Sequence, residues 1–173
     1  MDPGQSLRDF RDDQRGATRR MPKIDISKLE TRVGSPNYPP AFKPACAGRH
    51  KTALGNAVGL NQFGVNLTKL EPGAATSILH WHEQEDEFVY ILQGECVLVE
   101  ETGEVTLKAG DCAGWKANVP NGHCIVNRSN ADVLLLEVVT RSPFERSTYP
   151  GSDLRFERDG KTVRVLHKDG TPY

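Results

Sequence analysis

The stretch HWHEQEDEFVYILQG, residues 80–94, decides how this chain folds and where its chemistry lies. Side chains alternate between the two faces of a β-strand, so His80 and His82 point the same way. Glu87 begins an apolar run and can return to that face across a short acidic connection. Two imidazoles and a carboxylate on one face can hold a divalent metal ion. The stretch therefore predicts a metal site in a β-protein.

Strand patterns continue beyond this stretch. From residue 63 onward, short apolar runs alternate with turns rich in Gly, Pro, Asn and Asp, which is typical of an antiparallel sandwich or barrel. The predicted strands are residues 63–70, 76–82, 87–93, 96–100, 104–107, 123–127, 133–140, 154–158 and 162–167. Gly94-Glu95 has the form of a two-residue hairpin turn, which would pair the strands on either side of it. A second hairpin is predicted around Asp159-Gly160.

The chain has 173 residues, which fits one domain with a tail. Residues 1–22 are rich in Asp and Arg and show no apolar face, so we predict a flexible tail. Residues 23–62 are predicted to be an N-terminal arm that packs on the barrel or on a partner subunit. Within the arm, Ile24 and Ile26 alternate like a short strand. Residues 63–173 would form the barrel and its C-terminal hairpin.

Charge and composition argue against several kinds of partner. Lys and Arg number 22 against 23 Asp and Glu, with no basic stripe, so we expect no nucleic-acid partner. No apolar run approaches the ~20 residues of a membrane span, so no membrane association is expected. Residues 1–20 lack the apolar core of a secretory signal, which favours a cytoplasmic protein with free thiols. The cysteines are Cys46, Cys96, Cys112 and Cys124.

A further donor can be sought farther along the chain. His123 begins a predicted strand, and alternation places it on one face with Ile125 and Asn127. The chain between His82 and His123 is long enough for several strands to bring the two histidines together. The other histidines fit less well, because His50 lies in a basic loop and His167 ends the last hairpin.

Other acids precede the apolar strand. Glu83 and Glu85 could replace Glu87 as the carboxylate donor, but only Glu87 begins the strand itself. Asn127 could either orient a ligand or cap a turn.

These residues together resemble the cupin family. Its first motif is matched by Gly73, His80, His82, Glu87 and Gly94, and its second by Gly110, Pro120, Gly122, His123 and Asn127. The first gap is one residue longer than is usual in the family. In the second motif the stretch from glycine to histidine is longer by two residues, and Gly122 directly precedes His123. The resemblance covers roughly residues 63–140.

The resemblance implies an all-β fold, a cupin-type double-stranded β-helix (jelly-roll) barrel with an N-terminal extension. It also implies a divalent metal ion held by His80, His82, Glu87 and His123. Imidazole suits Zn, Fe, Ni or Mn, and a single carboxylate does not decide among them. An octahedral ion would keep two open positions, which allow Lewis-acid or dioxygen chemistry.

Such a barrel would offer a pocket for a small organic ligand, with apolar walls and the metal at one end. The candidate lining residues are Ile78, Val89, Ile91, Trp115, Ile125 and Asn127. We therefore expect a metal-dependent enzyme of the dioxygenase, isomerase or lyase type. No general base can be identified besides the ligands, since Tyr90 should point away from the pocket. The alternative is a non-catalytic ligand-binding or sensory protein, in which the metal anchors ligand or structure.

The opposite face of the central strand is also informative. If Glu87 points inward, then Phe88, Tyr90 and Leu92 point outward, and this set is too apolar for a solvated face. The arm or a second subunit should cover it. We favour a homodimer.

Overall fold

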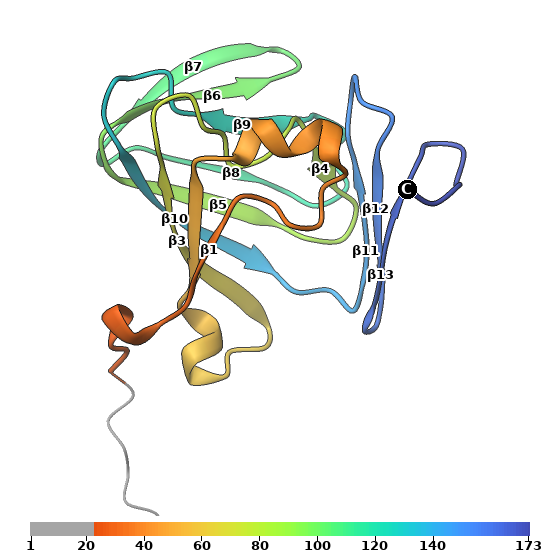
Figure 1. Cartoon of the computed structure of the whole chain (residues 1–173), viewed down its shortest axis with the longest axis horizontal. Helices are drawn as coiled ribbons and strands as arrows, with labels where there is room; N and C mark the ends of the chain where they lie inside the picture. The colour runs from red at the N-terminus through yellow and green to blue at the C-terminus, as the bar shows by residue number, and fades with distance from the viewer. Residues whose placement is uncertain (1–22) are drawn as a thin grey trace, which may run out of the picture.

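A six-stranded antiparallel sheet forms the largest wall of a β-barrel (Figure 1). The computed structural model describes residues 23–173, so the predicted tail at residues 1–22 lies outside the described part of the chain. In spatial order the strands of this sheet are β1 (Thr31–Val33), β2 (Arg49–Ala53), β3 (Phe63–Leu70), β10 (Val133–Thr140), β5 (Glu87–Gln93) and β8 (Cys112–Trp115).

Two smaller sheets complete the barrel. One consists of β13 (Thr162–Leu166), β12 (Arg155–Asp159), β11 (Phe144–Thr148) and β4 (Trp81–His82), and the other of β7 (Gly103–Lys108), β6 (Glu95–Glu100) and β9 (His123–Val126). Isolated bridges from His80 to His123 and from Ala75 to Val126 join them. The short 3-10 helices are η1 (Ile26–Lys28), η2 (Pro40–Cys46) and η3 (Gly55–Val58). None of the helices among the described residues has the length and apolarity of a membrane span.

Strand alternation builds the core. On β5, Val89 and Ile91 are buried, whereas Phe88, Tyr90 and Leu92 face outward. On β10, Val133 and Leu135 are fully buried on the same inner face. The core cluster comprises Leu70, Ala74, Val89, Ile91, Cys96, Leu98, Leu107, Ile125, Val133 and Leu135. The predicted all-β barrel is thus confirmed, and the strands predicted at residues 63–70, 87–93 and 133–140 keep their bounds.

The hairpin predicted at Gly94-Glu95 is wrong. Strand β5 pairs with β10 and β8, whereas β6 pairs with β7 and β9, so the two strands belong to different sheets. Gly94 makes the corner between them with a φ of 87°. A Cβ atom at this position would lie 2.9 Å from the Asp132 carbonyl oxygen, so only glycine fits. The C-terminal hairpin is confirmed, because β12 pairs with β13.

Other expectations about local structure need correction. The strand expected at residues 76–82 shrinks to β4, because the chain before it makes only isolated bridges. Ile26 begins the 3-10 helix η1 and does not continue a strand. The arm, residues 23–62, supplies β1 and β2, and β2 pairs along β3 and so extends the large sheet. All four cysteines are free.

Candidate metal centre

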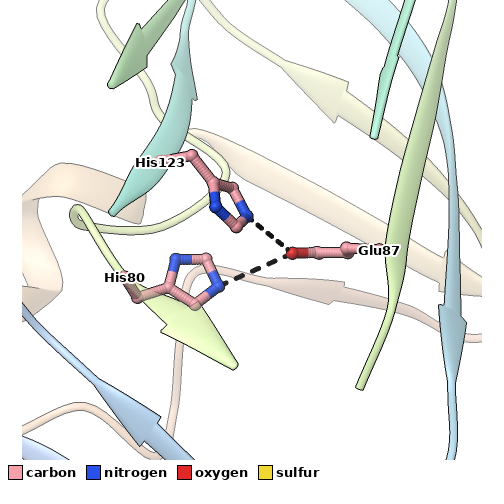
Figure 2. A group of neighbouring side chains, drawn as sticks. All are labelled: His80, Glu87 and His123. Carbon is pink, nitrogen blue, oxygen red and sulfur yellow. Dashed lines mark hydrogen bonds and ion pairs between the residues drawn. The ribbon is translucent and has the colours of Figure 1, made fainter. Parts of the chain in front are cut away.

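Four donor side chains converge at one end of the barrel. His82 lies on β4 and His80 just before it, while Glu87 and His123 begin β5 and β9. The Oε2 atom of Glu87 lies 2.9 Å from His123 Nε2, 3.6 Å from His82 Nε2 and 3.8 Å from His80 Nε2. The Nε2 atoms of His80 and His82 are 3.1 Å apart. Figure 2 shows His80 and His123 directing their ring nitrogens at the Glu87 carboxylate.

These separations suit a shared cation. Ligand atoms about 2.1 Å from one ion and at right angles to each other are about 3.0 Å apart, and wider angles give longer separations. The shortest distances, 2.9 and 3.1 Å, agree with the right-angle value. The 3.6 and 3.8 Å distances to Glu87 suit wider angles at the ion. His80, Glu87 and His123 therefore form a group that fits a divalent ion, and His82 lies beside it with its Nε2 atom 3.1 Å from that of His80.

Two of the imidazoles are hydrogen-bonded through Nδ1, which gives their rings the orientation that a metal ligand needs. His80 Nδ1 lies 3.1 Å from the carbonyl oxygen of Ile78, which can only accept, so Nδ1 carries the hydrogen. His82 Nδ1 lies 3.0 Å from a carboxylate oxygen of Glu145 and donates to it. In both rings Nε2 is left to face the cluster, as ligating histidines require.

Burial and neighbouring charges shift the pKa values of His82 and Glu87 in opposite directions. Burial lowers the pKa of His80 to about 3. Burial also acts to lower the pKa of His82, but hydrogen bonds to Glu145 and Glu87 outweigh it and raise this pKa to about 10. Burial acts to raise the pKa of Glu87, whereas the His123 and His82 side chains hold it well below its usual value. Glu87 is therefore an anion near neutral pH.

His123 is positioned differently from the other two imidazoles. Its Nδ1 atom is buried and has no hydrogen-bond partner among the described residues. Its ring instead stacks on Trp115 with centroids 3.8 Å apart and an interplanar angle of 4°. The Trp115 indole N–H donates to Glu100 Oε1 at 2.7 Å, which fixes the plane of the indole. Stacking thus orients the His123 ring.

The donors face a cavity of about 290 Å³ inside the barrel. Of the candidate lining residues, Val89, Trp115 and Ile125 contribute to its wall. The other three do not line it, which corrects the expectation for Ile78, Ile91 and Asn127. Ile91 is fully buried in the core.

Asn127 and Ile78 are absent from the cavity lining for local reasons. Asn127 is fully buried, and its amide donates to the carbonyl oxygens of Leu70 and Ala131, so it holds a turn together. The carbonyl of Ile78 faces the His80 ring, whereas its side chain is only half-buried and lies outside the cavity lining.

Several functional residues were not anticipated from sequence. Glu145 lies on β11, a strand that the pattern did not predict, and its side chain is 1% exposed. It accepts hydrogen bonds from His82 and from the backbone N–H groups of Glu83 and Gln84. Glu137, on the inner face of β10, also lines the cavity. Alternation along β10 would have marked Glu137 as buried, whereas nothing in the polar sequence of β11 marks Glu145.

The alternative donors lie elsewhere or have other partners. His50 bonds to Glu71, and His167 bonds to Asp153, both away from the cluster. Glu85 is close to His82 and Glu145, and these three acidic and imidazole groups could also be read as a metal cluster. However, Glu85 is paired with Arg158, and Glu145 is held by backbone N–H groups. Within this second group, Glu145 therefore serves to orient His82.

Comparison with known proteins places the chain in a family. The family model described as Cupin domain matches residues 66–139. A crystal structure from Silicibacter pomeroyi DSS-3, of a sugar phosphate isomerase from the cupin superfamily, is 44% identical, with 87% of this chain and 96% of that chain covered and a TM-score of 0.83. The chain belongs to the cupin superfamily.

Other cupins are similar to it. A protein of Acidithiobacillus ferrooxidans ATCC 23270, provisionally named a sugar phosphate isomerase, is 26% identical, with 84% and 88% of the two chains covered and a TM-score of 0.71. The oxalate-binding protein of Thermotoga maritima is 39% identical over 71 residues, or 41% of this cupin. The match spans only 56% of that relative's length.

Proposed function

We propose that this cupin is a metal-dependent isomerase of small sugar phosphates, with a divalent ion held by His80, His82, Glu87 and His123. The observation that carries the proposal is the convergence of these donors on the wall of a cavity of about 290 Å³. The similarity to the sugar phosphate isomerase of Silicibacter pomeroyi supports the choice of reaction, since it extends over 96% of that chain.

The charge of the cavity favours an anionic substrate. Its charged lining side chains are the cations Arg49, Lys51 and Arg158 and the anions Glu85, Glu87 and Glu137. These balance each other, so a divalent ion leaves the cavity net positive. The volume of about 290 Å³ is at the lower end for ligand pockets, which span roughly 300–1,000 Å³, and suits a small molecule.

When bound, the ion would supply Lewis-acid polarisation of a carbonyl or hydroxyl oxygen. The side chains of the cavity would do the rest. The indole of Trp115 and the side chains of Val89 and Ile125 form an apolar part of the wall and would limit the access of water to the reacting carbons. Arg49, Lys51 and Arg158 would attract the phosphate.

Turnover of aldose phosphates tests the proposed reaction. We expect the purified protein, with its metal content measured, to convert at least one of the phosphates of ribose, arabinose, glucose and mannose to its ketose. Nuclear magnetic resonance of the sugar carbons follows the conversion, and a chelator-treated sample is the control. Failure on all four sugars would refute the proposal, and about one equivalent of iron would favour a dioxygenase.

Ligand binding without turnover is the second candidate function. The similarity to the oxalate-binding protein of Thermotoga maritima favours it, although that match covers 56% of the relative. A dicarboxylate would satisfy the same net positive cavity. Calorimetric titration with oxalate that shows tight, metal-dependent binding, in a protein that leaves every sugar phosphate unchanged, would select this function.

Metal uptake should release protons. The pKa of His82 is raised to about 10, so at pH 7 this ring carries a proton that a metal ion must displace. We expect Zn²⁺ binding at pH 7 to release about one proton and its affinity to rise roughly tenfold per pH unit between pH 7 and 9. Calorimetry in buffers of different ionisation enthalpy measures the proton. A proton-neutral reaction would contradict the role of His82.

The apolar outer face of β5 supports the homodimer as a further proposal. Phe88, Tyr90 and Leu92 are 42%, 39% and 43% exposed, so the described arm does not cover them. Leu136 and Val138 of β10 lie beside them across the sheet. An uncharged sheet face of this kind can pack on a second copy about a two-fold axis.

Sedimentation at micromolar concentration tests the dimer. We expect a dimer for the unmodified chain and a monomer for Tyr90→Lys, because a charge at the centre of this face would have to be desolvated. Lys108→Glu, on the exposed β7, is the control and should remain dimeric. A monomeric unmodified chain would rule the dimer out.

A further inference from the structure

A buried carboxylate lies on the inner face of the large sheet, away from the four donors. Along β10 the residues Val133, Leu135, Glu137 and Val139 share this face by alternation. The Glu137 side chain is 3% exposed and lines the cavity, with Val89 of β5 and Asn66 of β3 directly opposite it. Burying a charge costs several kcal/mol unless it is well paired. We therefore ask which function the buried Glu137 carboxylate serves.

The partner of this carboxylate is also part of the cavity wall. Lys51 on β2 places its Nζ atom 2.5 Å from Glu137 Oε2, and Lys51 is 31% exposed. Apart from this ion pair, Oε2 has no hydrogen-bond partner among the described residues. Glu137 therefore keeps acceptor capacity that the fold does not use, and it lies on the surface that a ligand would contact.

The sheet register sets the position of Glu137 relative to the donors. On β5, Glu87 is opposite Val139 of β10, and Val89 is opposite Glu137. Glu87 and Glu137 are thus diagonal neighbours on one face, a relation that places such residues about 7–8 Å apart. One small molecule can span this gap, with an oxygen at the donors and the adjoining carbons beside Glu137.

We propose that Glu137 is the catalytic base of this cupin, and that the substrate is an α-hydroxy carbonyl compound. The proposal rests on the proposed isomerase function and supplies its missing proton acceptor. The substrate carbonyl oxygen would lie at the four donors, and the hydrogen on the adjacent hydroxyl-bearing carbon would face the Glu137 carboxylate.

The proton transfers balance without any other reactant. The Glu137 carboxylate takes the proton from the hydroxyl-bearing carbon, and the C–H electrons form the carbon–carbon double bond of an enediolate. The carbonyl oxygen gains the proton of the neighbouring hydroxyl, whose oxygen is left with the negative charge. The protonated Glu137 then returns its proton to the former carbonyl carbon, and the second oxygen becomes the new carbonyl. Nothing is oxidised or reduced overall, because an aldose and its ketose are isomers.

Lys51 gives the base a route to solvent. Its ammonium contacts Glu137 and is 31% exposed, so a proton held by Glu137 can exchange with water through it. Turnover in heavy water should then place deuterium on the product carbon that receives the proton. A direct hydrogen shift between the two carbons would leave the product unlabelled.

Glu137→Gln tests the proposal, with the panel of aldose phosphates as the probe and heavy water as solvent. The amide keeps the shape but accepts no proton, so we expect kcat to fall about 10²–10⁴-fold. KM and metal content should stay within a factor of about three, since neither depends on proton transfer. The matched control is Glu95→Gln, an exposed acid on β6, which should keep the full rate.

A second variant covers the case in which the lone Lys51 charge unfolds the protein. Glu137→Gln combined with Lys51→Met removes both charges, and we expect it to fold, to bind metal and to remain inactive. Either variant turning over within tenfold of the unmodified protein would overturn the base role while the isomerase function stands. Turnover of the unmodified protein without deuterium in the product would overturn the exchange route through Lys51. A lack of turnover in the unmodified protein would overturn both proposals.

Discussion

His82→Ala is expected to lose nearly all of its bound metal. His82 contributes one of the four convergent donors, and its Nε2 atom lies 3.1 Å from His80 Nε2 and 3.6 Å from Glu87 Oε2. Alanine offers no donor, and water in its place would be held only weakly in a half-buried site. Loss of residues that merely orient a ligand costs 10–100-fold in affinity, so loss of the ligand should cost at least about 100-fold. Elemental analysis after dialysis against a weak chelator measures the effect.

The control for this variant removes an imidazole outside the cluster. His50→Ala breaks only the bond to Glu71 and should keep the metal content of the unmodified protein. His123→Ala serves as the second test, since it removes a donor from a different strand while leaving the bond between His82 and Glu145 intact. Full metal content in both donor variants, with a normal circular dichroism spectrum, would refute the assignment of the ligands.

The strands with apolar runs could be predicted from sequence, whereas the pairing between strands could not, and polar strands such as β11 were missed. The apolar runs gave the bounds of β3, β5 and β10, and alternation identified the inner face of β5. It could not show that β5 and β6 belong to different sheets, since the local sequence at Gly94-Glu95 is the same as that of a hairpin turn. Which strand lies next to which depends on contacts between segments far apart in the chain.

The proposed donors could be named from sequence, His80, His82 and Glu87 by their short spacing and the full set of four through the resemblance to cupins. His80 and His82 are two residues apart, and Glu87 and His123 begin their strands. The residues that support them were missed, since their polar side chains are buried only by distant partners. Glu145 and Ser147 on β11 face the His82 ring across 63 and 65 positions of sequence. A polar strand of this kind resembles a loop when it is read alone.

Substitutions of Glu145 can separate its role in orienting His82 from its role in holding the backbone. Its carboxylate accepts the Nδ1–H of His82 at 3.0 Å and so fixes the tautomer that leaves Nε2 for the metal. It also accepts the backbone N–H groups of Glu83 and Gln84 at 3.2 and 2.9 Å. Glu145→Ala leaves these buried donors without partners, at about 1–3 kcal/mol each, so we expect it to be strongly destabilised as well as poor in metal.

Glu145→Gln is therefore the sharper test. The amide oxygen can still accept a backbone N–H, so this variant should keep most of the stability that Glu145→Ala loses. It no longer offers a charged acceptor to His82, and we expect metal affinity to fall about 10–100-fold. Competition against a chromophoric chelator gives the affinity, and urea unfolding of the metal-free protein gives the stability. Glu104→Gln, which removes only the surface ion pair with Arg128, should leave the metal affinity unchanged. If Glu145→Gln bound metal as tightly as the unmodified protein, the carboxylate would be holding the backbone alone, and the orientation of His82 would have to come from Ser147, whose hydroxyl lies 3.2 Å from the same nitrogen.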